Sequence, residues 1–160
     1  MAKLQIQIEQ VRKTVYAILV GSIDEDADFE RIPTQGIISF NFDMNGIEAI
    51  NSCGIREWIQ LLDRMDTHAK VVYRNCPSCI VDQFNIAADL TMRNATIESF
   101  YAPYYCGFCD KESSQLLTME DVIETKDLPS RLCDCGRTLQ ADVPKEGYLS
   151  FMSLFTGSPG

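Results

Sequence analysis

Four cysteines in the C-terminal third of the chain have the type and spacing of metal ligands. They form two close pairs, Cys106-Gly107-Phe108-Cys109 and Cys133-Asp134-Cys135, separated by residues 110–132. Two such pairs can present four thiolates to one tetrahedral metal ion. The first pair has the usual C-x-x-C spacing, and the second is one residue shorter, which does not exclude ligation. We therefore expect Zn²⁺ to be bound by Cys106, Cys109, Cys133 and Cys135.

The expected zinc would be structural, because four thiolates complete the coordination shell and leave no position for water or substrate. The segment around the ligands, residues 106–140, resembles a zinc ribbon. Its short length leaves little core, so metal binding would supply its folding free energy. Disulfides are disfavoured in a reducing cytoplasm. Unliganded thiols or disulfides are nevertheless the alternatives to zinc at these four positions.

A third cysteine pair, Cys76-Pro77-Ser78-Cys79, lies between a predicted strand and a predicted helix. A helix start lowers the pKa of a thiol, so Cys76 and Cys79 could serve a thiol-disulfide oxidoreductase. The order differs from the Cys-Gly-Pro-Cys of thioredoxins. We favour a structural role in which Pro77 begins the helix and Cys79 packs inward as a small apolar side chain.

A serine hydroxyl at the predicted start of another helix is the second candidate for chemistry. It belongs to the motif Asn51-Ser52-Cys53-Gly54, which follows an apolar strand at residues 36–42. The helix is predicted from apolar residues that recur every three or four positions: Ile55, Trp58, Ile59, Leu62 and Met65. Either Asn51 or Ser52 would be its N-cap. A helix N-terminus also favours a phosphate, so Ser52 is a candidate phosphorylation site.

The remaining elements predict a sheet covered by helices. Residues 4–8 and 15–19 form two antiparallel strands, residues 69–73 and 96–100 two further strands, and residues 77–90 a second long helix. Strands that alternate with helices require crossover connections. We expect an α/β fold with a mixed β-sheet. The acidic run between Asp24 and Glu30 most simply forms a solvated loop, with a cation site as the alternative.

In both the order of these elements and the local motifs, residues 24–90 resemble a STAS domain, the fold of bacterial anti-sigma factor antagonists. The family's Gly-x-Leu/Ile-Asp segment corresponds to Gly21-Ser22-Ile23-Asp24, and its Asp-Ser-Ser/Thr-Gly motif to Asn51–Gly54. The resemblance implies that Ser52 is phosphorylated and that the protein partner is an anti-sigma factor or a related serine kinase. Asn51 and Cys53 depart from the family motif, and a constitutive, non-phosphorylated binder is the alternative.

The end of the chain predicts one more helix. Pro144 begins it, and its large apolar residues share one face: Tyr148, Phe151, Met152 and Phe155. We expect this face to return to the core, with an exposed partner-binding stripe as the alternative. The predicted organisation is a STAS-like domain at residues 1–105, a zinc-ribbon-like insert at 106–140 and a returning helix at 141–160.

Composition narrows the functional classes. The 160-residue chain has a formal net charge of −9, which disfavours binding to nucleic acid or anionic lipid. It has no apolar run of membrane-spanning length and no signal peptide, so a soluble cytoplasmic protein without membrane insertion is expected. His68, the only histidine, lies in a polar turn and is not expected to act as a general base. We therefore expect a non-enzymatic regulatory module that binds a protein.

Overall fold

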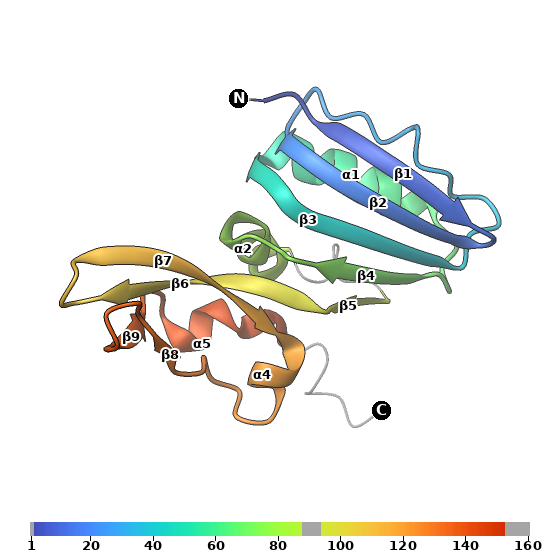
Figure 1. The fold of residues 1–160 in the computed structure, drawn as a ribbon. Coiled ribbons are helices and arrows are strands. Elements are labelled where there is room, and N and C mark those ends of the chain that lie inside the picture. The colour runs from blue at the N-terminus through green and yellow to red at the C-terminus, as the bar shows by residue number, and fades with distance from the viewer. Residues whose placement is uncertain (1, 88–93, 153–160) are drawn as a thin grey trace.

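The computed structural model describes residues 2–87 and 94–152, which form two sheets (Figure 1). The first sheet has the order β1-β2-β3-β4-β5. Its strands are β1 (Gln5–Val11), β2 (Thr14–Ile23), β3 (Ser39–Ile50), β4 (Lys70–Arg74) and β5 (Ala95–Ile97). β1 pairs antiparallel with β2, whereas the pairs from β2 to β5 are all parallel. This mixed sheet confirms the predicted α/β fold class.

Two helices cross one face of the first sheet, α1 (Ser52–Arg64) and α2 (Ser78–Ile86) (Figure 1). Each provides a crossover between parallel strands, α1 between β3 and β4, and α2 between β4 and β5. α2 is shorter than the predicted 77–90 helix within the described chain, and residues 88–90 lie outside that part. No helix in residues 2–87 and 94–152 is long and apolar enough to cross a membrane.

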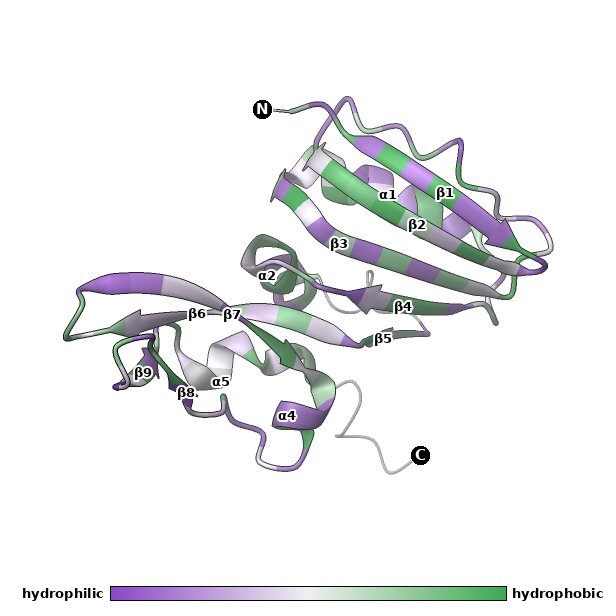
Figure 2. Ribbon diagram, viewed as in Figure 1, coloured by the Kyte–Doolittle hydropathy of each residue, from purple (hydrophilic) through white to green (hydrophobic). Residues whose placement is uncertain are grey.

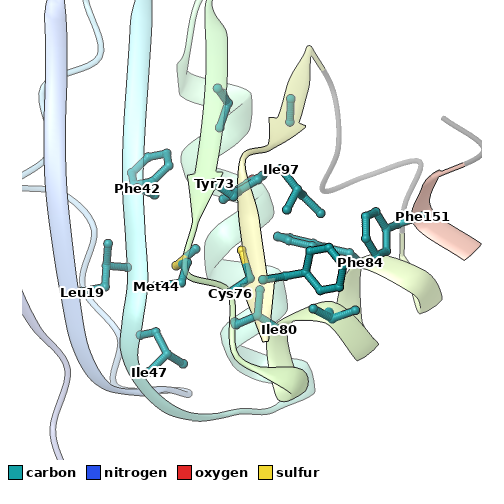
Figure 3. Packing of buried hydrophobic residues seen from close by; sticks show 14 of the residues in the cluster. Leu19, Phe42, Met44, Ile47, Tyr73, Cys76, Ile80, Phe84, Ile97 and Phe151 are labelled. Carbon is teal, nitrogen blue, oxygen red and sulfur yellow. The ribbon is translucent and has the colours of Figure 1, made fainter. Parts of the chain in front are cut away.

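An aromatic cluster joins the helices to the sheet. Trp58 of α1 contacts Phe42 of β3 with 4.8 Å between ring centroids, and its indole N–H donates to the Tyr73 hydroxyl at 3.0 Å. Phe29, from the acidic loop, packs edge-on against Trp58 at 5.1 Å. Figure 3 shows Phe42 and Tyr73 among the buried side chains, and Figure 2 shows the alternation of polar and apolar residues along β3. The period of two puts every second strand residue in the core.

The second sheet has the order β7-β6-β9-β8. Its strands are β6 (Ser99–Cys106), β7 (Lys111–Thr118), β8 (Arg131–Leu132) and β9 (Thr138–Ala141), and the short helix α4 (Met119–Ile123) follows β7. The expected single strand at 96–100 is divided at Glu98 between β5 and β6. Antiparallel pairing with β7 and β9 assigns β6 to the second sheet. The expected boundary after residue 105 therefore falls within β6 and not between the two sheets.

The sheets meet immediately after β4. The Cys76 N–H donates to the Ser99 carbonyl at 3.2 Å, and the Tyr101 N–H donates to the Cys76 carbonyl at 2.8 Å. The Ser99 hydroxyl accepts the Asn75 N–H at 2.8 Å and lies 3.2 Å from the Asn75 side-chain oxygen. Asn75 has a positive φ of 54°, which turns the chain out of β4. These bonds place the start of β6 beside the end of β4.

The predicted last helix is broken into α5 (Lys145–Tyr148) and a 3₁₀ turn at Ser150–Met152. Asn85 of α2 bonds to both sides of the break: its side chain donates to the Tyr148 carbonyl at 2.9 Å and accepts the Phe151 N–H at 2.8 Å. Tyr148, Phe151 and Met152 are buried, as predicted, against α2 and Phe100 of β6. Phe155 lies outside the described residues.

Loss of the Ser99 hydroxyl should weaken the junction between the sheets. Ser99→Ala leaves the Asn75 N–H without its acceptor, at a cost of about 1–3 kcal/mol in the free energy of unfolding. The exposed Ser114 of β7 provides a matched control, for which Ser114→Ala should change stability by less than about 0.5 kcal/mol. Urea denaturation measures both. Equal stability of the two variants would contradict a structural role for this hydroxyl.

Candidate functional site

Asn51, not Ser52, caps α1. Its backbone is extended, with φ −118° and ψ 179°, and its side-chain oxygen accepts the Gly54 N–H at 2.8 Å. The cap leaves Ser52 as the first residue of the helix, exposed to solvent together with Cys53. The sequence permits either Asn51 or Ser52 as the cap, and in the structure the cap is Asn51. The Ser52 side chain is therefore not used for capping and remains exposed.

Gly54 allows α1 to begin directly against the end of β2. A Cβ at this position would lie 2.0 Å from the carbonyl oxygen of Ile23 and 2.9 Å from the backbone nitrogen of Asp24. The Asn51 N–H donates to the same Ile23 carbonyl at 3.1 Å. The two motifs singled out in the sequence, Gly21–Asp24 and Asn51–Gly54, are thus in backbone contact. We call the surface formed by the partly exposed Asp24 and the exposed Glu25, Asn51, Ser52 and Cys53 the α1 entrance.

Glu25 is a member of the α1 entrance that the sequence did not single out. The Asn51 side-chain N–H donates to its carboxylate at 3.0 Å. Hydrogen bonds from the Glu25 backbone and from the Asn51 amide lower the pKa of this carboxyl below its ordinary value. An aspartate at position 51 would instead place two carboxylates against each other. The amide of Asn51 satisfies both the helix N–H and Glu25, whereas Asp24 accepts the Asp26 N–H at 2.9 Å and shapes the turn.

The four candidate metal ligands converge at one end of the second sheet. Their sulfur atoms all lie within 4.8 Å of one another. The Cys106 and Cys135 sulfurs are 3.7 Å apart, and those of Cys109 and Cys133 are 3.9 Å apart. A tetrahedral ion with metal–sulfur bonds of about 2.3 Å requires sulfur–sulfur separations of about 3.8 Å. The shorter second pair therefore does not prevent convergence, and the cluster could hold a metal ion.

Tight turns orient these sulfurs. In the turn after β6, the Cys109 N–H donates to the Cys106 sulfur at 3.4 Å. In the turn before β9, the Cys133 N–H donates to the Arg137 carbonyl and the Gly136 N–H to the Cys133 carbonyl, both at 2.8 Å. Gly136 has a φ of +89°, a conformation that glycine adopts without strain. The second turn thereby aims both Cys133 and Cys135 at the first pair.

The thiols of the cluster differ in acidity. A hydrogen bond from the Arg137 backbone and bonds from the neighbouring thiols lower the pKa of Cys135 to about 7. The Cys109 thiol, hydrogen-bonded to Cys135, has its pKa raised to about 12. The lowered pKa of Cys135 favours the thiolate form, which is the form that binds a metal ion, and a bound metal would displace the remaining protons.

The Cys76–Cys79 pair has the opposite environment. Cys76 is completely buried, and desolvation, with Asp43 and Cys79 nearby, raises the pKa of its thiol well above the ordinary value. Burial also raises the pKa of Cys79. Redox catalysis requires an accessible thiolate. This geometry gives no support to an oxidoreductase. His68 is exposed in a turn, 3.5 Å from the Asp66 carboxylate.

Comparisons with known proteins find a match among solved structures but none among family models or curated proteins. No protein-family model matches the chain, and no curated protein matches it. Among solved structures, the chain is similar to the anti-sigma factor antagonist SpoIIAA in its unphosphorylated form. The match covers 44% of this chain and 73% of that chain, with 17% sequence identity and a TM-score of 0.33. A likeness this low gives no information about function.

A side chain at position 54 should separate α1 from β2. Gly54→Ala puts a methyl group where the Ile23 carbonyl lies, and relief requires the helix or the strand to move, at a cost of about 3 kcal/mol. Gly147→Ala is the control, since its nearest neighbour would be 4.0 Å away. Thermal unfolding followed by the fluorescence of Trp58, the only tryptophan, measures both. A Gly54→Ala protein as stable as wild type would refute the close contact.

Proposed function

We propose that the protein is a non-enzymatic regulatory module of the anti-sigma factor antagonist type that binds a protein through the α1 entrance. The exposure of Ser52 on a rigidly held helix start is the observation that carries this proposal. The Asn51 cap and the Gly54–Ile23 contact hold the backbone there, while Ser52 and Cys53 face solvent. A preformed and exposed surface binds a partner with a small entropic cost.

In the proposed switch, phosphorylation of Ser52 releases the partner. A phosphate adds almost two negative charges, and it would lie beside Asp24 and Glu25 in a surface whose charge is already negative. The helix N-terminus would stabilise the phosphorylated form itself, but docking would then require desolvation of this charge.

The constitutive binder is the second candidate, and the Asn51–Glu25 hydrogen bond favours it, because Glu25 already brings a carboxylate to the helix start.

The partner that we propose is an anti-sigma factor or a related serine kinase, as the STAS motifs suggest. The net charge of −9 favours a partner with a basic docking surface over nucleic acid. We place this interaction in the cytoplasm, where reduced thiols remain available to a metal.

Substitutions at Ser52 test the switch. Ser52→Ala should retain the partner, and Ser52→Asp should weaken its capture from an extract of the source organism by about tenfold or more, because it adds charge to the docking surface. Ser78 is a matched control, since it is also exposed and the first residue of a helix. Ser78→Ala and Ser78→Asp should both bind normally. Binding measured with the isolated partner gives the affinity ratio.

Two outcomes would contradict parts of this proposal. Equal affinity of Ser52→Ala and Ser52→Asp would exclude a Ser52 switch and leave the constitutive binder. Retention of the same partner by Asn51→Ala and by Ser52→Arg, in protein whose fold is verified by circular dichroism, would exclude docking at the α1 entrance.

We also propose that Cys106, Cys109, Cys133 and Cys135 bind a structural Zn²⁺. The sulfur spacing fits a tetrahedral ion with a completed shell, and soft thiolates favour zinc over harder cations. The ion would join the turn after β6 to the turn before β9, which are distant in the sequence. The second sheet has short strands at β8 and β9, so the metal would supply much of their stability.

Removal of the metal should therefore destabilise the second sheet and leave the first sheet folded. We expect one zinc per chain by elemental analysis, and a strong chelator should increase hydrogen exchange in β8, β9 and both cysteine turns. Trp58 fluorescence, which reports the first sheet, should change little. Cys135→Ser should lose zinc, whereas Cys53→Ser, at an exposed cysteine outside the cluster, should retain it. Purified protein without stoichiometric metal, or unchanged exchange after chelation, would refute the zinc site.

A further inference from the structure

The strand β7 forms an unprotected edge of the second sheet. It pairs with β6 in one continuous register over all eight residues, and no strand in the described part of the chain pairs with its other side. Residues 113–118 contain no charge, proline or glycine. Natural edge strands usually carry such features, because exposed N–H and C=O groups are a template for another strand. An extended segment can therefore hydrogen-bond along β7.

A small cavity adjoins this edge. Its volume is about 150 Å³, and it lies between alternate residues of β7 and the loop that carries the second cysteine pair. Three cysteines of the candidate metal cluster, Cys109, Cys133 and Cys135, form one wall of the cavity. The other lining residues are Lys111, Ser113, Gln115, Leu132, Asp134 and Leu139. The volume corresponds to about five water molecules, which suits one side chain and is below the usual size of a small-molecule site. A strand added to β7 presents every second side chain to this face.

Charge indicates which side chain the cavity accepts. Asp134 contributes a carboxylate to the lining. The Gln115 side-chain N–H donates to the Ser113 hydroxyl at 3.2 Å, which leaves the Gln115 side-chain oxygen as a further acceptor. The nearby thiolates, with a zinc ion bound, carry a net charge of about −2. Lys111 is the only cation in the lining. Two arginines near this end of the sheet have other partners: Arg137 stacks 3.6 Å from the centroid of the Phe108 ring, and Arg131 lies 3.3 Å from Asp121.

We propose that β7 and this cavity bind an extended segment of a partner protein, which adds a strand to the sheet and inserts an arginine beside Asp134. The planar guanidinium has five donors and can reach several separate acceptors at once. Main-chain bonds to β7 would provide affinity, and the cavity would provide specificity. The charge argument depends on the proposed zinc centre, whereas the docking site is distinct from the α1 entrance.

A designed peptide tests this proposal in protein verified to contain one zinc. The probe is acetylated Ser-Thr-Val-Thr-Arg-Thr-Val-Thr-Ser amide, and its control has citrulline, a neutral isostere, in place of arginine. In two-dimensional ¹⁵N NMR titrations, the arginine peptide should shift the amides of β7 and Asp134. The citrulline peptide should bind at least tenfold more weakly. Asp134→Asn should lose a similar factor, whereas Asp26→Asn, in the loop after β2, should lose none.

Two N-methylated probes test strand addition separately. The first probe is N-methylated on the backbone nitrogens of the two threonines next to the arginine. The second is N-methylated on the backbone nitrogens of the arginine and of the two valines. Because alternate N–H groups of a strand point in opposite directions, only one of the two peptides should lose binding. Equal affinity for arginine and citrulline, equal binding of both methylated probes, or shifts away from β7 would overturn the proposal. Those results would leave the zinc content and the Ser52 experiment unaffected, so failure of this proposal is distinguishable from failure of the proposed zinc site and of the proposed function.

Discussion

Two backbone hydrogen bonds at Cys76 determine how the rest of the molecule is arranged. They join Cys76 to Ser99 and Tyr101, so β6 begins beside the end of β4 instead of extending the first sheet. From this junction β6 runs for about 24 Å, at about 3.4 Å per residue, to Cys106. The junction therefore sets the position of the cysteine cluster relative to the first sheet. It also explains the burial of Cys76, whose backbone and side chain both lie inside the contact between the sheets.

Both candidate surfaces are negative, but for different reasons. At the α1 entrance the charge comes from carboxylates, and Asn51 holds Glu25 next to the helix start. At the proposed β7 surface, Asp134 provides it, and the cysteine cluster would add to it once a metal ion is bound, while nearby arginines have partners of their own. If both proposals hold, the net charge of −9 and these two surfaces would favour basic protein partners. One surface is held by a glycine contact and the other by the cysteine turns, so changes at one need not disturb the other.

Periodic segments were predictable from the sequence, and short or polar ones were not. The apolar spacing of Trp58 and Leu62 predicted α1, because a helix that covers a sheet must bury one face. β7 was missed, since it is an edge strand with few buried side chains. α4 was missed because it has five residues, although Thr118 and Asp121 form a capping box that the sequence displays. The bonds from Asn85 to both sides of the break after Tyr148 join segments distant in the sequence and could not be anticipated.

The sequence by itself determined the mixed sheet, the apolar face of α1 and the two cysteine pairs, because periodicity and ligand spacing are local properties. Tertiary structure decided that Asn51 is the cap, that Glu25 belongs to the α1 entrance, and that Cys76 is buried while four other thiols converge. These outcomes depend on contacts between segments far apart in the chain. A residue's burial, its partners and its pKa follow from such contacts, and its neighbours in the sequence do not specify them.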